Sequence, residues 1–231
     1  MRELSPAPLR QRGSRQRRSL LAMMSFIVAL PAHSWTSVKG PFSDEIHQTA
    51  IDNVLTPSMN STDRGILKDQ QALVDKDQDA DQSAEHAMTG VIKGDSYSVV
   101  LKSKYIVLTE DLVRAALLDA IKNRKENQTA IALQSLGKAI HALEDSTSPA
   151  HEKFAVWSDD FGIWEMAKHV AKERVYPNDD PPQRYQSHLE GTVGYAYAIY
   201  MEAAPMPAHF FSPVDGSLII PPQYLHIYRH P

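Results

Sequence analysis

The residues best suited to bind a metal ion lie in one stretch, Leu136 to His151. His141 and Asp145 are four residues apart, and on an α-helix this spacing places both side chains on one face, about 5–6 Å apart at Cβ. An imidazole nitrogen and a carboxylate oxygen so placed can share a divalent cation. Pro149 ends or bends the helix and can return His151 toward the same region. The stretch therefore predicts a metal site.

Further histidines and acidic residues along the chain could complete this site. His169 and Glu173 repeat the four-residue spacing on another predicted helix, and facing helices of a bundle commonly supply the ligands of one metal centre. His47 lies on the first predicted helix, and His86 follows an acidic segment. Asp75, after a short apolar run, is the preferred acidic ligand upstream of His86. The competing ligands are Asp77, Asp79 and Asp81.

Each candidate also has an ordinary structural interpretation. His141 with Asp145 could be a surface ion pair worth roughly 0.3–0.5 kcal/mol, His169 with Glu173 could face solvent, and Asp75 could belong to a solvated acidic loop. The run from His151 to Ala155 has the start of a metalloprotease motif but lacks its second histidine, which counts against a peptidase. The other histidines lack the helical carboxylate spacing and are interpreted as structural or surface residues: His188, His209, His226 and His230.

Helices dominate the elements that must position these side chains. The 3.6-residue period predicts a helix from Thr109, as its N-cap, to about Asn123 and a second one from Gln128 to Glu144. The second helix should bury Ile131, Leu133, Leu136, Ile140 and Leu143. Further helices are expected to begin at Ser43 and Ser61, and to cover Ala84–Met88, Phe161–Val175 and Tyr185–Ala203.

Non-helical structure is expected in two places. β-Branched and aromatic residues fill 91–108 around Gly94, which favours a short hairpin or an extended excursion. The proline-rich tail after Pro205 should be extended and lie over the helical body. Gly137, one turn before His141, permits a close approach by a neighbouring helix or by the chain terminus. The fold class is therefore all-α: a single multi-helix bundle domain with a Pro-rich extended C-terminal tail.

Residues 1–34 have the layout of a secretory signal peptide. A basic run from Arg10 to Arg18 precedes an apolar segment from Leu20 to Leu30, and the small residues Ala32 and Ser34 follow. The apolar segment is about a dozen residues long, whereas a membrane-spanning helix needs roughly 20. We therefore expect cleavage after Ser34, a secreted or periplasmic protein, and one mature domain over residues 35–231 that begins with Trp35.

Composition limits the possible partners and ligands. The chain has 231 residues, 42% of them hydrophobic and 23% charged, which suits one globular domain with a core. Its formal net charge of −4 becomes more negative once the arginine-rich leader is removed, which argues against tight nucleic-acid binding through a basic surface. Because there is no cysteine, any metal must be held by His, Asp, Glu or the chain terminus.

The stretch from Leu136 to His151, His-x-x-x-Asp closed by Pro-x-His, resembles the signature of the zinc-dependent phospholipase C family, whose fold is shared with single-strand nucleases. That family binds three zinc ions and uses the amino group and carbonyl of an N-terminal tryptophan. The expected cleavage would place Trp35 in that position, so two separate parts of the chain agree with the resemblance.

The resemblance implies a set of ligands for each of the three zinc ions. The first zinc would take Trp35 and His47, and Asp145 would bridge it to the second. The second would be completed by His86, His141 and an upstream aspartate, preferably Asp75. The third would take His151, His169 and Glu173.

The implied activity is hydrolysis of phosphodiesters by a water molecule that zinc activates, with Asp145 bridging the ions and Asp75 orienting the water or taking its proton. A phospholipid is the favoured substrate, which implies contact with a membrane surface. The alternatives are a single-strand nuclease of the same fold and an inactive, metal-stabilised binding module. The acidic composition favours the lipid, because a nuclease gains affinity from cationic and base-stacking surfaces. Three late tyrosines could serve either substrate: Tyr195, Tyr197 and Tyr200.

Overall fold

The structure is a computed structural model, and it describes residues 46–76, 80–162, 164–165, 168–169, 172 and 183–225. All of these belong to one compact unit, Ala32–Pro231. Several predictions lie outside the described residues: the signal peptide with its cleavage site, most of the helix expected at Phe161–Val175, and the residues Trp35, Asp77, Asp79, Glu173, His226 and His230.

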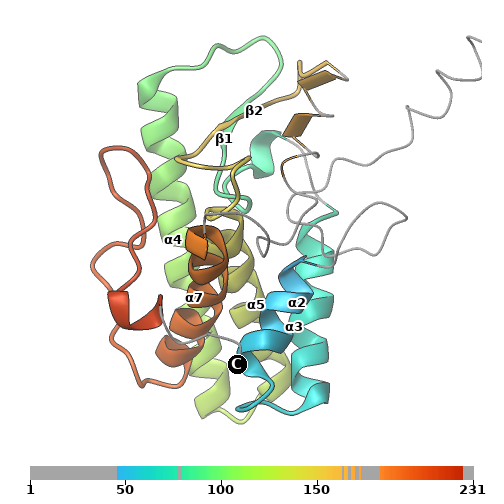
Figure 1. The fold of residues 1–231 in the computed structure, drawn as a ribbon. Coiled ribbons are helices and arrows are strands. Elements are labelled where there is room, and N and C mark those ends of the chain that lie inside the picture. Colours follow the sequence, from blue (N-terminus) through green and yellow to red (C-terminus); the bar gives the residue numbers. More distant parts are fainter. Residues whose placement is uncertain are drawn as a thin grey trace, which may run out of the picture. The chain divides into compact units, whose positions relative to one another are not determined.

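Five α-helices and one pair of short strands make up the described part of the chain (Figure 1). In chain order they are α2 (Ile46–Leu55), α3 (Ser61–Val74), β1 (Thr89–Val91), α4 (Val99–Lys125), α5 (Thr129–Asp145), β2 (Val156–Ser158) and α7 (Gln183–Tyr200). Single 3₁₀ turns lie at Ala80–Gln82 and Pro222–Tyr224. The predicted all-α class is confirmed. None of the described helices is long and apolar enough to span a membrane.

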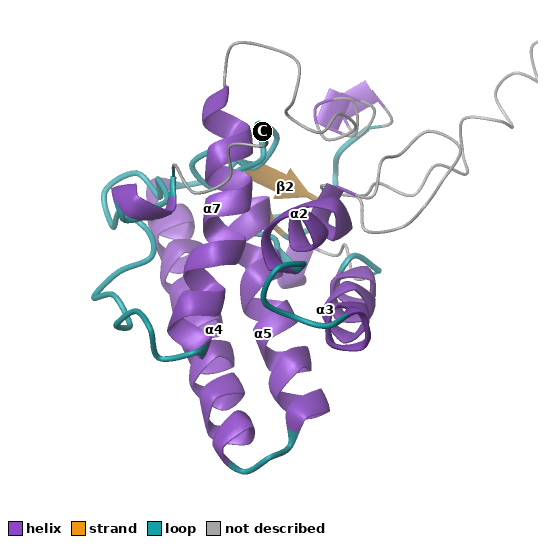
Figure 2. Cartoon of the chain, turned by 60° about the horizontal axis from the view of Figure 1, so that its bottom comes forward, coloured by secondary structure: helices purple, strands orange, loops and turns teal. Residues whose placement is uncertain are grey.

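Helix α5 lies at the centre of the bundle, in contact with α3, α4 and α7, while α2 packs between α3 and α7 (Figure 2). Its last seven residues, 139–145, are all buried. A helix that is enclosed on all sides must bury its polar residues too, so its histidine and its two acidic residues need partners inside the protein. The predicted apolar face is confirmed except at Ile131, which is half exposed near the start of the helix.

Helices α5 and α3 approach each other closely at Gly137. A Cβ atom there would lie 3.0 Å from Cβ of Gln70 and 3.3 Å from the carbonyl oxygen of Leu67. The expected close approach by a neighbouring helix is therefore confirmed, and the neighbour is α3. Asp75 is the C-cap of α3, so this contact helps to set its distance from the face of α5 that carries His141 and Asp145.

The N-cap of helix α4 lies eleven residues before the predicted one. It is Ser98, whose side chain accepts a hydrogen bond from the backbone N–H of Leu101. The expected hairpin or extended excursion over residues 91–108 is therefore wrong for residues 99–108, which are helical, whereas residues 92–98 are not helical. Thr109 lies buried inside the helix and donates from Oγ1 to the carbonyl oxygen of Ala84. The β-branched residues lower helix propensity by a few tenths of a kcal/mol each, and packing of Tyr105 and Ile106 against the body overrides that preference.

The segment expected to be helical at Ala84–Met88 forms consecutive turns instead. Ala87 adopts a positive φ of 49°, which an α-helix cannot contain. The turns lead into β1, which pairs in parallel with β2 in the register Thr89↔Val156. Thr89 also donates from Oγ1 to the carbonyl oxygen of Phe154. The strand pair therefore ties the loop that carries His86 to the segment that follows His151.

The tail after α7 contains no α-helix among its described residues, as expected, and lies against α4 and α7. Glu110 on α4 accepts hydrogen bonds from the backbone N–H groups of Phe210 and Phe211. Arg114, one turn later, donates to the carbonyl oxygens of Pro207 and Ala208. These four hydrogen bonds satisfy backbone groups that have no partner strand and hold the tail on the bundle.

Candidate metal centre

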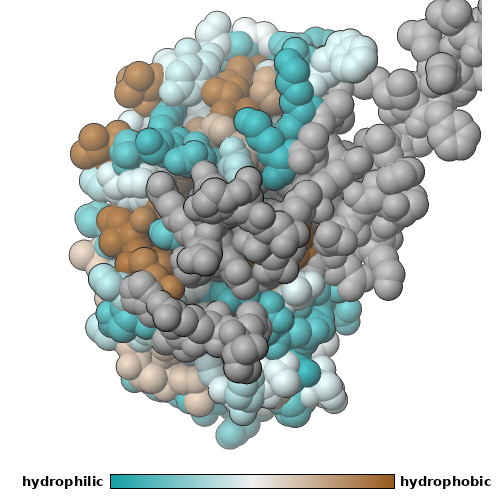
Figure 3. All heavy atoms as spheres, viewed as in Figure 1, coloured by the Kyte–Doolittle hydropathy of each residue, from teal (hydrophilic) through white to brown (hydrophobic). Residues whose placement is uncertain are grey.

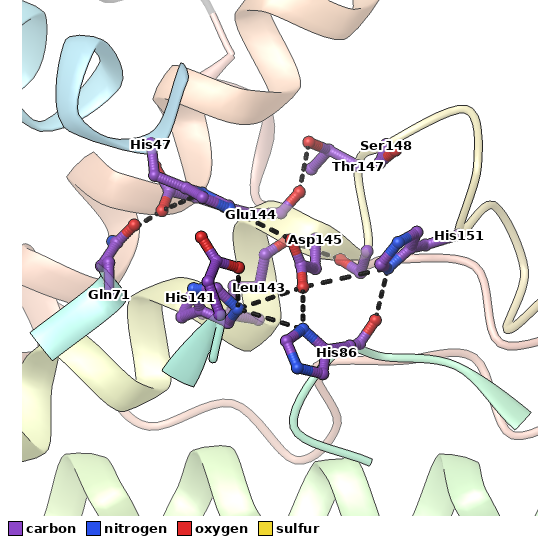
Figure 4. Close-up of polar contacts among 12 residues, drawn as sticks. His47, Gln71, His86, His141, Leu143, Glu144, Asp145, Thr147, Ser148 and His151 are labelled. Atoms are coloured by element: carbon purple, nitrogen blue, oxygen red, sulfur yellow. Dashed lines mark hydrogen bonds and ion pairs between the residues drawn. The ribbon is translucent and has the colours of Figure 1, made fainter. Parts of the chain in front are cut away.

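Six of the predicted site residues meet at the C-terminal end of α5 (Figure 4). They come from well-separated parts of the chain: α2, the end of α3, the loop before β1, α5 itself and the turn that follows it. All six are at least 97% buried: His47, Asp75, His86, His141, Asp145 and His151. Burying so many ionisable groups is costly unless they are paired or bind a cation.

Asp145 is the carboxylate on which the histidines converge. Its Oδ1 lies 3.2 Å from Nε2 of His47. Its Oδ2 lies 2.8 Å from Nδ1 of His86 and 3.2 Å from Nε2 of His141. Burial opposes ionisation of this carboxyl group, but the neighbouring His141 and His151 outweigh it and hold the pKa of Asp145 well below its usual value. Asp145 is therefore an anion whose two oxygens face different histidines, as a bridging ligand requires.

The spacing of the imidazole nitrogens is compatible with a shared metal ion. Nε2 of His141 lies 3.2 Å from Nδ1 of His86, although two facing imidazole nitrogens can share only one proton. Two nitrogen ligands at 2.0–2.1 Å from a tetrahedral zinc ion stand about 3.3 Å apart. Nε2 of His47 is buried and makes no hydrogen bond within the described residues. The donor set of these three histidines thus matches a dication.

Among the described residues, Asp75 is the aspartate of this upstream segment that reaches the cluster. Its Oδ1 lies 3.5 Å from Nε2 of His141. By contrast, Asp81 is exposed to solvent. Two overlapping groups have their ligand atoms within 4.8 Å of one another and could hold metal ions: His47 with Asp75 and His141, and His86 with His141 and Asp145.

His151 and His169 form a second pair beside the first cluster. Nδ1 of His151 donates to the carbonyl oxygen of His86 at 2.6 Å, which turns its Nε2 toward Nε2 of His169, 3.2 Å away. Histidines that bind metals usually donate their other N–H to a carbonyl or carboxylate in this way. Trp157 packs edge-on against His169. The third expected member of this group, Glu173, lies outside the described residues.

Sequence reasoning missed two residues of the site, Glu144 and Gln71. Oε2 of Glu144 accepts hydrogen bonds from Nδ1 of His47 at 2.9 Å and from Nε2 of Gln71 at 2.7 Å. Burial disfavours the charged form of His47, but Glu144 and Asp145 together raise the pKa of this histidine well above its usual value. Burial also raises the pKa of Glu144 itself. One sequence signal pointed to Glu144, since it is a charged residue in the most apolar half of α5.

Two other predictions concern residues around the site. The backbone at Lys153 and Phe154 is left-handed, with φ of 57° at both, so the run from His151 to Ala155 cannot form the helix that a metalloprotease motif needs. His209 is exposed, as expected, whereas His188 lines a small cavity of about 80 Å³ next to the end of α5.

Two of the three late tyrosines are not available to a substrate, whereas Tyr197 is half-buried. Tyr195 is buried and stacks near Phe210 and Tyr224. Tyr200 is buried beneath the guanidinium group of Arg124. The aromatic side chains of α7 therefore fasten the tail and the end of α4 to the bundle.

Comparison with known proteins adds nothing to this geometry. No protein-family model, curated protein or solved structure matches the chain. The structure by itself shows that buried His and Asp side chains from distant parts of the chain are placed so that they could hold a metal ion.

Proposed function

We propose that this protein is a zinc-dependent phosphodiesterase, and that its substrate is a phospholipid, as in the phospholipase C family that its sequence resembles. One observation carries the proposal: three histidines and two aspartates that are far apart in the chain converge, buried, around the end of α5 with nitrogen–oxygen and nitrogen–nitrogen distances of 2.8–3.5 Å. Metal ions shared among these atoms would be consistent with nitrogen and oxygen donors that face one another at such distances.

Three ions are proposed, with the ligand sets that the resemblance implies. The described residues fit those sets where they can be compared, because Asp145 lies between His47 on one side and His86 with His141 on the other. Zinc ions held here would polarise the phosphoryl oxygens and supply an acidic water molecule near neutral pH.

The chain's own residues then have separate tasks. Asp145 holds its negative charge between the histidines and keeps their nitrogens aimed inward. Asp75 would orient the attacking water or take its proton, since its Oδ1 lies in the cluster, 3.5 Å from Nε2 of His141. Glu144 holds the His47 ring in the orientation that directs Nε2 into the cluster.

The buried tyrosines favour a lipid over a single-stranded nucleic acid. Proteins that bind single strands stack bases on exposed aromatic rings along a cationic groove. Tyr195 and Tyr200 are at most 5% exposed, and the chain has a net negative charge. The nuclease activity remains the alternative outcome of the test.

The test combines metal content with turnover. Purified protein should contain zinc, measured by elemental analysis, and should release phosphocholine from phosphatidylcholine vesicles until a chelator removes the metal. Zinc-loaded protein that cleaves single-stranded DNA but releases no phosphocholine would replace the lipase with the nuclease. Zinc-loaded protein that cleaves neither would contradict the hydrolase, and protein that binds no zinc would contradict the metal centre itself.

A further inference from the structure

Within the described part of the chain, a group of exposed apolar residues lies where α4 begins. Residues 92–100 are exposed without interruption. They include Ile92, Tyr97, Val99 and Val100, and the two valines are 73% and 80% exposed. Figure 3 shows hydrophobic surface, interleaved with hydrophilic surface, over the beginning of α4 at the upper left. We refer to residues 92–104 as the α4 tip.

The α4 tip carries a local charge opposite to that of the whole chain. It contains Lys93, Lys102 and Lys104 but one acidic residue, Asp95, whereas the chain has a formal net charge of −4. Within the described residues, none of these three lysines forms an ion pair. Apolar side chains among unpaired lysines match a surface that is apolar inside and anionic outside, as a membrane of anionic lipids is.

The α4 tip also extends past the end of the bundle that holds the metal centre. Helices α4 and α5 run antiparallel, and Thr109 of α4 contacts Ala84, two residues before His86. The ten helical residues that precede Thr109 rise about 15 Å beyond this level. Of these, Tyr105 and Ile106 are packed against the body, so the turns before them project.

From this geometry we infer that the α4 tip is a docking surface for anionic lipid membranes, with Val99 and Val100 entering the interface and Lys93, Lys102 and Lys104 contacting the headgroups. The inference rests on the proposed function only in its choice of a lipid as partner, because the docking needs neither bound metal nor hydrolysis. Docking here would bring the metal-centre end of the bundle toward the lipid.

A fluorescent label can test the docking at a single position, because the chain has no cysteine. An environment-sensitive dye is attached to Val100→Cys and, as the matched control, to Leu118→Cys. Leu118 is 54% exposed and lies 18 residues further along α4. That spacing is five helical turns, so both positions share one face about 27 Å apart.

The dye at position 100 should shift its emission to the blue on vesicles of phosphatidylglycerol, and the dye at position 118 should not. The shift should persist with a chelator and weaken with added salt. Lys102→Ala with Lys104→Ala should weaken vesicle binding about fivefold per lysine removed, while Leu118→Asp should leave it unchanged. Because the dye reports on position 100 alone, binding of vesicles by another segment would not imitate this result.

Three results would overturn the inference. Equal shifts at positions 100 and 118 would mean that no particular surface docks, and the absence of any shift on anionic vesicles would mean that the α4 tip stays in water. A shift that appears without vesicles and grows with protein concentration would assign the surface to a second copy of the chain. None of these results depends on phosphodiester hydrolysis, so they are distinguishable from failure of the proposed function.

Discussion

Glu144 accepts a hydrogen bond from Nδ1 of His47 at 2.9 Å, although the two residues are 97 positions apart in the chain. The bond leaves Nε2 of the same ring 3.2 Å from Asp145. Two neighbouring acidic residues of α5 therefore act on opposite sides of one imidazole: Glu144 sets its orientation, and Asp145 faces the nitrogen that points into the cluster. Four predictions follow from this arrangement and from the packing that supports it.

Glu144→Gln should weaken metal binding by about 10–100-fold, because loss of the carboxylate partner of a ligating histidine has that effect in metal sites. Gln71 should still contact the new side chain, so the fold should persist. Competition with a fluorescent chelator measures the affinity, and circular dichroism checks the folding. Glu126→Gln, at the exposed C-cap of α4, is the control. Unchanged affinity in Glu144→Gln would show that His47 needs no orienting partner.

Asp145→Asn should lose both zinc and turnover. The substitution keeps the shape of the side chain but removes the charge that faces His47, His86 and His141. Zinc content per chain and phosphocholine release are measured on the same preparation. A variant that retained its full zinc and its full rate would rule out Asp145 as a bridging ligand.

Two glycine substitutions should have opposite effects on stability. A Cβ at Gly137 would meet Gln70 and the carbonyl oxygen of Leu67 at 3.0 and 3.3 Å. The clash should cost about 1–3 kcal/mol, more than the gain of roughly 1 kcal/mol from replacing glycine by alanine in a helix. Gly65, inside α3, has no atom within 4 Å of the added Cβ, so Gly65→Ala should stabilise the protein by about 0.5–1 kcal/mol.

Urea unfolding of both glycine variants, with a chelator present throughout, gives the two free energies without any contribution from bound metal. A Gly137→Ala protein as stable as Gly65→Ala would mean that α3 can move away from α5 at no cost.

Asp52 should make stability depend on pH in the acid range. Burial opposes its ionisation, but hydrogen bonds from Lys68 and Arg64 outweigh burial and lower its pKa. Because the pKa in the folded state is the lower one, the ionised pair stabilises the protein above the unfolded-state pKa, about 3.9. This contribution is lost as the pH falls through the folded-state pKa.

Asp52→Asn should therefore reduce the free energy of unfolding by about 0.5–1 kcal/mol at pH 7, a modest value because the carboxylate is partly exposed. The difference from the unsubstituted protein should shrink below pH 4. Chemical unfolding at several pH values measures it, and a difference that stayed constant down to acid pH would contradict the role of this ion pair.

The sequence alone was enough to predict the elements whose signals are local. Apolar residues at helical spacing predicted α5 within one residue at each end, and Ser61 marked the start of α3. His141 and Asp145 could be placed on one helical face because four residues always return to that face of an α-helix. The choice of Asp75 among four nearby aspartates followed from the apolar run before it.

Only the tertiary structure could decide what depends on contacts between distant segments. Residues 99–108 carry strand-like side chains but are helical, because burying Tyr105 and Ile106 against the body outweighs a weak local preference. Tyr195 and Tyr200 of α7 gave no local sign that they would be buried beneath the tail and Arg124.

The pairing of Glu144 with His47 shows the same limit within the site. Which acidic residue of α5 pairs with His47 depends on where α2 lies against α5. No periodicity along either helix encodes that position. Local spacing thus determined which side chains could bind a metal, while the packing of helices far apart in sequence decided which of them meet, because burial energy is gained only when the whole bundle assembles.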